Sequence, residues 1–276
     1  MSLQTMPSHK RTIGFQALAK VAILLGLGIY FAYNLLTGNI NNYVNPQWAW
    51  LSGVAAILFV ILALVSIYAY LRERPQPTHE HLHDYDHDED HVHQHASHSH
   101  AAVTWPVLSI LLLPLVLGIG VPSQPLGASA LENSAGTTRS MIERAGPADD
   151  NDTTRWNIWD WQRTYYANVH PDDWFNGKEA NFSGFVFHPG GLGPDEFVLA
   201  RYVMRHCAAD AFGVGMLVKS PGGGSLPQDT WLQLNGAMAV EPFQGEDTLL
   251  VKSNTLTNLD SPDNPYIYPS FYVVPK

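Results

Sequence analysis

Residues 48–71 read WAWLSGVAAILFVILALVSIYAYL and contain no charged side chain. A helix that crosses a bilayer needs about 20 consecutive apolar residues, and a helix that is apolar on every face has no side to turn toward water. The aromatic residues Trp48, Trp50, Tyr68 and Tyr70 stand at the two ends of this stretch, where a bilayer has its interfaces. The stretch therefore predicts a transmembrane helix.

Two further apolar stretches flank this one in the sequence. The first covers about residues 13–36 and has Lys20 as its only charge, and the other covers about residues 101–121 and has none. Each reaches the length of about 20 residues that is needed to cross the hydrocarbon core. We expect three transmembrane helices within a membrane region of residues 1–121.

The basic residues near these helices predict their orientation. Lys10 and Arg11 precede the first helix, Arg72 and Arg74 follow the second, and residues 37–47 between them carry no charge. Loops rich in lysine and arginine stay in the cytoplasm. This multi-pass protein of the cell membrane should therefore keep its N-terminus and second loop in the cytoplasm and place its C-terminal domain outside it.

The second loop, residues 75–100, is rich in histidine. It carries nine histidines and six acidic residues but no lysine or arginine. Imidazole binds zinc, nickel, copper and cobalt, and the acidic residues raise the local concentration of cations. Without thiolates we expect exchangeable binding of Zn²⁺ or another divalent transition metal, and the alternative is a polar spacer. The candidate ligands are His79, His81, His83, His87, His91, His93, His95, His98 and His100.

The second half of the chain predicts a soluble, mostly β domain. Residues 122–154 are rich in Ser, Ala, Gly, Pro and Asp and are interpreted as a linker to a domain of residues 155–276. Five strand-like runs separated by turn signals suggest an α+β fold class overall, with an OB-like barrel after the helices, although a small sandwich fits the same pattern. The runs are 179–187, 196–204, 212–218, 229–240 and 247–256.

Aromatic residues crowd the start of this domain, between Trp156 and Trp174. Aromatic rings gather either at a membrane interface or in a protein core. We therefore expect these rings to contact the membrane or to lie under the barrel, rather than to form a ligand site.

Charge and cysteine content exclude several classes of function. The net charge is −10, and from Val121 onward there are 18 acidic and 10 basic residues, so a nucleic-acid partner is not expected. Cys207 is the only cysteine, which excludes an intramolecular disulfide and a Cys-x-x-Cys site.

A possible second metal site lies at His206, Cys207 and Asp210. If this segment forms a helical turn, His206 and Asp210 share a face, and so do Cys207 and Asp210. His188 or His170 could then supply a third ligand. Two alternatives remain open, which are chemistry at an activated thiol and a structural turn in which Cys207 is buried and Asp210 acts as a cap.

These residues resemble the YcgQ-like family of bacterial membrane proteins. The histidine-rich loop and the stretch RxxxxxCxADAxxxG (201–215) support the resemblance, which spans nearly the whole chain. Matching segments are TGNINNYVNPQWAWLSGVAAIL (37–58), LLPLVLGIGVPSQPLGASAL (112–131), NGKEANFSGFVF (176–187), FVLARYVMRHCAADAFGVGMLV (197–218) and NPYIYP (264–269).

The resemblance implies a larger membrane permease as the partner and a link to zinc or similar metal homeostasis. Relatives often carry two adjacent cysteines where this chain has His206 and Cys207, so a dithiol role is not expected. We expect a non-enzymatic accessory component of a permease system, embedded in membrane lipid. The alternatives are a membrane-anchored structural or interaction module and an extracytoplasmic enzyme that uses Cys207.

Overall fold

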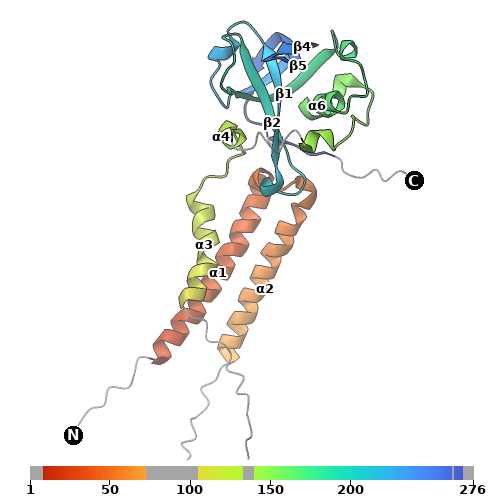
Figure 1. Ribbon diagram of the computed structural model, residues 1–276. Helices are drawn as coiled ribbons and strands as arrows, with labels where there is room; N and C mark the ends of the chain where they lie inside the picture. Colours follow the sequence, from red (N-terminus) through yellow and green to blue (C-terminus); the bar gives the residue numbers. More distant parts are fainter. Residues whose placement is uncertain (1–8, 73–104, 133–139, 263, 270–276) are drawn as a thin grey trace, which may run out of the picture. The chain divides into compact units, whose positions relative to one another are not determined.

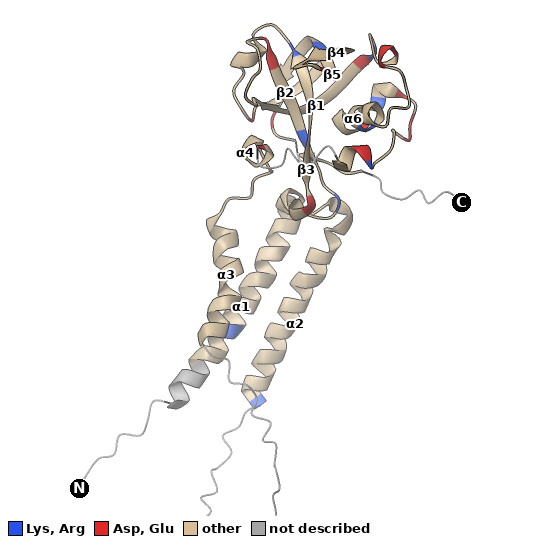
Figure 2. Cartoon of the chain, viewed as in Figure 1, with Lys and Arg blue, Asp and Glu red and all other residues tan. Residues whose placement is uncertain are grey.

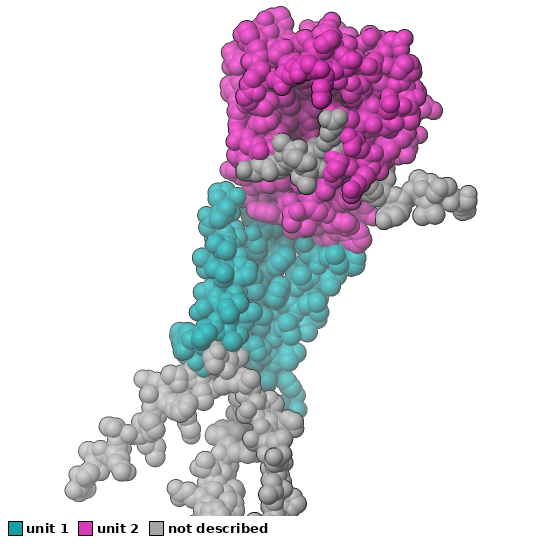
Figure 3. Space-filling view, viewed as in Figure 1, with its two compact units in different colours: residues 1–37, 50–122 teal, residues 38–49, 123–276 magenta. Residues whose placement is uncertain are grey.

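The computed structural model describes residues 9–72, 105–132, 140–262 and 264–269. The chain divides into two compact units (Figure 3). Residues 1–37 and 50–122 make up the helical unit, and residues 38–49 and 123–276 make up the barrel unit. The segment that joins the first two helices thus belongs to the barrel unit, although it lies far from the barrel in sequence.

The described residues of the helical unit form three helices (Figure 1). They are α1 (His9–Thr37), α2 (Trp50–Arg72) and α3 (Trp105–Gly120). The first two have the length and composition of membrane-spanning helices, whereas α3 is apolar but has only 16 residues. The predicted count of three membrane-spanning helices is therefore not confirmed by length. From residue 15 onward, Lys20 and Arg72 are the only charged residues of these helices (Figure 2).

Small residues allow α1 to pack closely against both other helices. A Cβ atom added at Gly28 would lie 3.3 Å from the Ala56 carbonyl oxygen of α2. A Cβ atom added at Gly118 of α3 would lie 2.5 Å from the Tyr30 ring of α1. Helices in membranes commonly associate through small residues of this kind, since lipid offers no hydrophobic driving force between them.

The core of the barrel unit is a closed five-stranded barrel with a short sixth strand. The strand order is β1-β4-β5-β3-β2, and β1 also pairs with β2, which closes the ring. The β3–β5 pair is parallel, and the other pairs of the ring are antiparallel. The strands are β1 (Glu179–Phe187), β2 (Glu196–Val203), β3 (Phe212–Lys219), β4 (Trp231–Phe243), β5 (Glu246–Asn258) and β6 (Tyr266–Ile267).

The change of partner along β1 closes the barrel. Residues 179–185 pair with β4, and residues 185–187 pair with β2. Gly184 allows the strands to cross closely here, because an added Cβ atom would lie 2.6 Å from the Ala200 carbonyl oxygen. The closed ring of five strands confirms the predicted barrel, and the alternative of a small sandwich is wrong.

Helix α6 (Ile158–Tyr166) covers the place where β3 and β5 separate. Pairing between these strands begins only at Leu217 and Leu250. Before that point, Gln162 Nε2 donates to the Gly215 carbonyl (2.7 Å) and the Tyr165 hydroxyl donates to the Asp247 carbonyl (2.8 Å). The helix thus satisfies backbone groups that the open end of the parallel pair leaves without a strand partner.

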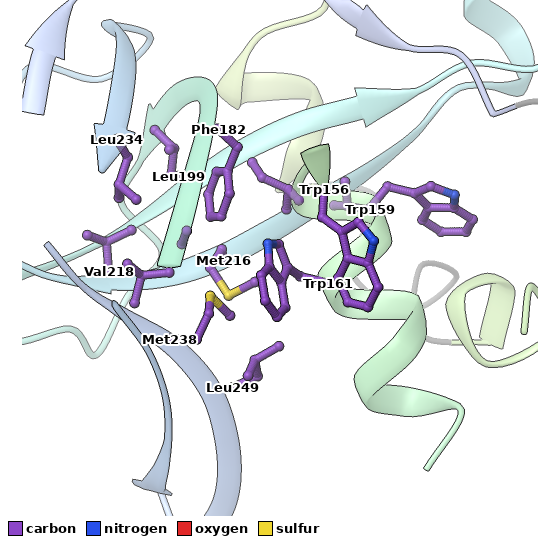
Figure 4. Packing of buried hydrophobic residues seen from close by; sticks show 14 of the residues in the cluster. Trp156, Trp159, Trp161, Phe182, Leu199, Met216, Val218, Leu234, Met238 and Leu249 are labelled. Atoms are coloured by element: carbon purple, nitrogen blue, oxygen red, sulfur yellow. The ribbon is translucent and has the colours of Figure 1, made fainter. Parts of the chain in front are cut away.

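The aromatic cluster of the sequence lies in the core. Trp156, Trp159 and Trp161 are each less than 5% exposed and pack against residues of the barrel interior such as Met216 and Leu249 (Figure 4). Of the two positions expected for these rings, burial under the barrel is the observed one. Part of the predicted linker also belongs to this unit, because Ile142 lies in the same core and Ala128 begins the short helix α4 (Ala128–Leu131).

Candidate functional site

The segment between α1 and α2 pairs with a turn of the barrel near residue 207. Val44 and Cys207 form an isolated antiparallel β-bridge. The Asn45 amide donates to the His206 carbonyl (3.0 Å), and the Ala208 amide donates to the Tyr43 carbonyl (2.8 Å). The buried Asn45 side chain adds a hydrogen bond to the Arg205 carbonyl (2.8 Å).

The segment that follows α3 is fastened to the same region. The Leu126 amide donates to the Tyr266 hydroxyl (3.0 Å), and the Ala128 amide donates to Asp229 Oδ1 (2.7 Å). The Tyr202 hydroxyl donates to the Gly127 carbonyl (3.0 Å), and burial raises the pKa of Tyr202 to about 12. Both connections between the helical unit and the barrel therefore end on barrel residues.

A C-terminal segment, residues 264–268, completes this region, and we call it the strap. Strand β6 pairs with β2, and the Met204 amide donates to the Ile267 carbonyl (2.9 Å). Arg201 donates to the carbonyls of Asn264 (2.7 Å) and Pro265 (3.1 Å). We call residues 42–45, 123–128, 205–210 and 264–268 together the collar.

Asp210 organises the turn that contains the predicted second site. Its carboxylate accepts the backbone amides of Arg205, His206 and Cys207 at 3.0–3.3 Å. The His206 ring adds a hydrogen bond from Nδ1 to Asp210 Oδ2 (2.7 Å). Burial alone would raise the pKa of this carboxyl, but the hydrogen bonds outweigh it and the pKa lies below its ordinary value of 3.8. Asp210 thus caps a 3₁₀ turn at Ala208–Asp210.

Other candidate ligands do not gather around this turn. His188 Nε2 lies 2.8 Å from the Leu226 carbonyl, and the His170 ring stacks on Trp174 with 3.9 Å between the centroids. Among the described residues, no three histidines, cysteines or acids lie close enough together to hold a metal ion. The His206 ring bonds Asp210 through Nδ1, and Cys207 is a free, half-buried thiol. The second metal site remains a prediction.

The nine loop histidines all lie outside the described residues. Their metal binding therefore also remains a prediction from composition.

A cleft crosses the outer face of β2 and β3. It consists of two hollows of about 400 and 450 Å³ that share Pro189, Gly190, Val198 and Gly215. Among its described lining residues Glu132 is the only charged one. The FGVG stretch of β3 is the feature of the sequence that could have predicted this cleft. Its two glycines lie on one face of the strand and leave that face without side chains.

Two family models match consecutive parts of the chain. The DUF1980 N-terminal domain matches residues 19–136, and the DUF1980 C-terminal domain matches residues 137–269. The chain belongs to the DUF1980 family. The chain is 27% identical to UPF0703 protein YcgQ of Bacillus subtilis (strain 168), over 91% of this chain and 99% of that protein. The resemblance that the sequence motifs suggested is therefore confirmed.

A second relative comes from Streptococcus mutans serotype c. It bears the description "Putative two-component membrane permease complex subunit" and is 22% identical, over 89% of this chain and 96% of that protein. No solved structure matches the chain.

The role of Asp210 predicts a pH-dependent effect of Asp210→Asn. This change should lower the free energy of unfolding by about 1–2 kcal/mol at pH 7, because a charged cap of four donors is lost. The pKa of Asp210 is depressed by folding, so its contribution is present above about pH 4 and disappears as the pH falls through the lower folded-state value. Unfolding of the full chain in detergent, followed by tryptophan fluorescence at pH 7 and pH 3, measures both effects.

The exposed Asp260 provides the matched control. Asp260→Asn should leave stability unchanged at both pH values. A difference between wild type and Asp210→Asn that is the same at pH 7 and pH 3 would show that the ionised carboxylate does not stabilise the turn.

Proposed function

We propose that this protein is a non-enzymatic accessory subunit of a membrane permease system that handles a divalent transition metal, with zinc as the first candidate. The permease partner is supported by the description of the Streptococcus mutans relative, which matches over most of both chains. The metal is supported by the nine histidines and six acids of residues 75–100. The helices α1 and α2 supply the membrane anchor.

The collar supports a topology in which the barrel and the histidine-rich loop lie on opposite sides of the membrane. Residues 42–45 bind the barrel through backbone hydrogen bonds, so the loop between α1 and α2 and the barrel share one side. If α2 crosses the membrane, residues 75–100 then lie on the other side. The chain must cross once more, through α3, to reach the barrel.

The short α3 is compatible with this third crossing. Its 16 residues span about 24 Å, which is less than the hydrocarbon core of about 30 Å. Apolar residues precede and follow it in the sequence, and a bilayer adapts to a short helix at modest cost. The close packing of Gly118 on Tyr30 also holds α3 against α1. The basic residues beside α1 and α2 then assign the barrel to the extracytoplasmic side.

The histidine-rich loop should account for most of the metal that the purified chain binds. With four ligands per ion, nine histidines correspond to about two ions. Replacing all nine loop histidines by glutamine should remove nearly all exchangeable zinc from the detergent-solubilised chain, as measured by equilibrium dialysis and elemental analysis. In a deletion strain, only the intact chain should restore the cell content of the metal concerned.

A variant with His9, His170 and His188 replaced by glutamine is the control, since these histidines lie outside the loop. It should bind and complement as the wild type does. Equal zinc binding by the loop variant, or normal metal content in the deletion strain for zinc, nickel, cobalt and copper, would contradict a metal role and leave the loop as a spacer.

Labelling of single cysteines should reveal the topology. In a Cys207→Ser background, Gln228→Cys places a thiol in an exposed turn of the barrel and Ser97→Cys places one in the histidine-rich loop. A membrane-impermeant maleimide should label position 228 on intact cells and position 97 only after permeabilisation. Labelling of position 97 on intact cells, or protection of position 228 there, would refute the proposed orientation.

A further inference from the structure

The hydroxyl of Tyr266 joins three segments that are distant in the sequence. It donates to the Asn42 carbonyl (3.0 Å) and accepts the Leu126 amide (3.0 Å). Tyr266 itself pairs with Tyr202 of β2 and is 3% exposed. One buried oxygen atom thus connects the segment between α1 and α2, the segment after α3, and the barrel.

The strap that carries Tyr266 is held firmly by the barrel. Arg201 donates to two strap carbonyls and also to Ser183 Oγ of β1 (3.2 Å). Within the described ranges this guanidinium has no carboxylate partner, so its hydrogen bonds go to the strap and to the neighbouring strand. Strand β6 is therefore a part of the barrel rather than a loose tail.

Two of the collar segments, residues 42–45 and 123–128, lie in the stretches of chain that connect the helices to the barrel. Residue 38 follows α1, residue 49 precedes α2, and residue 123 begins the segment after α3. A displacement of the strap would leave the Asn42 carbonyl and the Leu126 amide without their partner. Both hydrogen bonds are partly buried. Since backbone groups shielded from water are costly to leave without a partner, the strap and both segments should move together.

We propose that the collar is a coupling device in which Tyr266 makes the barrel and the segments that connect it to the helices, residues 42–45 and 123–128, one cooperative unit. An event on the barrel, such as contact with a partner, is then transmitted to the turn between α1 and α2. This coupling does not depend on metal binding by the histidine-rich loop, so the two proposals can fail separately.

Hydrogen exchange of Tyr266→Phe in the full chain, measured by mass spectrometry, tests the coupling. Leu126 is bonded directly to the Tyr266 hydroxyl, whereas the amides of Asn45 and Ala208 are bonded to His206 and Tyr43. A cooperative collar predicts that exchange rises about tenfold at all three positions, while β2 and β3 stay protected.

Tyr268→Phe is the matched control, because the Tyr268 hydroxyl is buried in the same strap and has no hydrogen-bond partner in the described parts of the chain. It should leave exchange in the collar unchanged. A rise confined to Leu126 in Tyr266→Phe, or no rise at all, would overturn the proposal, since the hydrogen bonds would then be independent.

A second variant keeps the test decisive if Tyr266→Phe also exposes the barrel strands. Asn45→Ala removes the hydrogen bond to the Arg205 carbonyl and the one that Asn45 Oδ1 accepts from the Gln47 amide. Neither bond involves Tyr266 or the strap. Coupling predicts faster exchange at Leu126 with β2 and β3 protected. Unchanged exchange at Leu126 would overturn the proposal.

Discussion

Backbone pairing between residues 43–45 and residues 206–208 is the constraint on which the account of this protein depends. Backbone amides and carbonyls that leave water need hydrogen-bond partners. The backbone groups of the short turn between α1 and α2 find these partners on a barrel whose first strand begins more than a hundred residues later. A turn held in this way stays with the barrel, so the proposed topology has both on the same side of the membrane. The proposed positions of the histidine-rich loop and of α3 both depend on this pairing.

The barrel itself follows from ordinary packing. Alternating apolar residues of five strands fill the interior, and the tryptophans before and within α6 cover the place where β3 and β5 part. The capping box of α6, in which Asn157 accepts the Asp160 amide and the Asp160 side chain accepts the Asn157 amide, fixes where this helix begins. The result is a well-packed barrel to which the collar segments 42–45 and 123–128 are hydrogen-bonded.

Local sequence patterns predicted most of the helices and strands. They did not predict the hydrogen bonds between segments that are far apart in the sequence. Strand β1 was predicted with its observed bounds, because alternation and turn residues are local signals. The hydrogen bond from Asn45 to Arg205 joins residues 160 positions apart, and that from Tyr266 to Asn42 joins residues 224 apart. The periodicity of apolar residues along the sequence cannot predict such contacts. The NPYIYP motif carries a family resemblance but does not indicate that Tyr266 binds the segments beside the helices. The sequence is compatible with Asp210 as a metal ligand or as a cap, and the structure shows four hydrogen-bond donors around its carboxylate.

A disulfide between positions 44 and 207 tests the central constraint most directly. Val44→Cys in the otherwise native chain places a second thiol opposite Cys207, and bridge partners lie within the range that a disulfide spans. With a protease site inserted in the histidine-rich loop, mild oxidation of membranes should keep the two cleaved fragments linked until a reductant is added. The control is a chain that carries both Val44→Cys and Cys207→Ser. It lacks the second thiol and should give separate fragments. Separate fragments from the variant that keeps Cys207, with both thiols free to react with maleimide, would contradict the account.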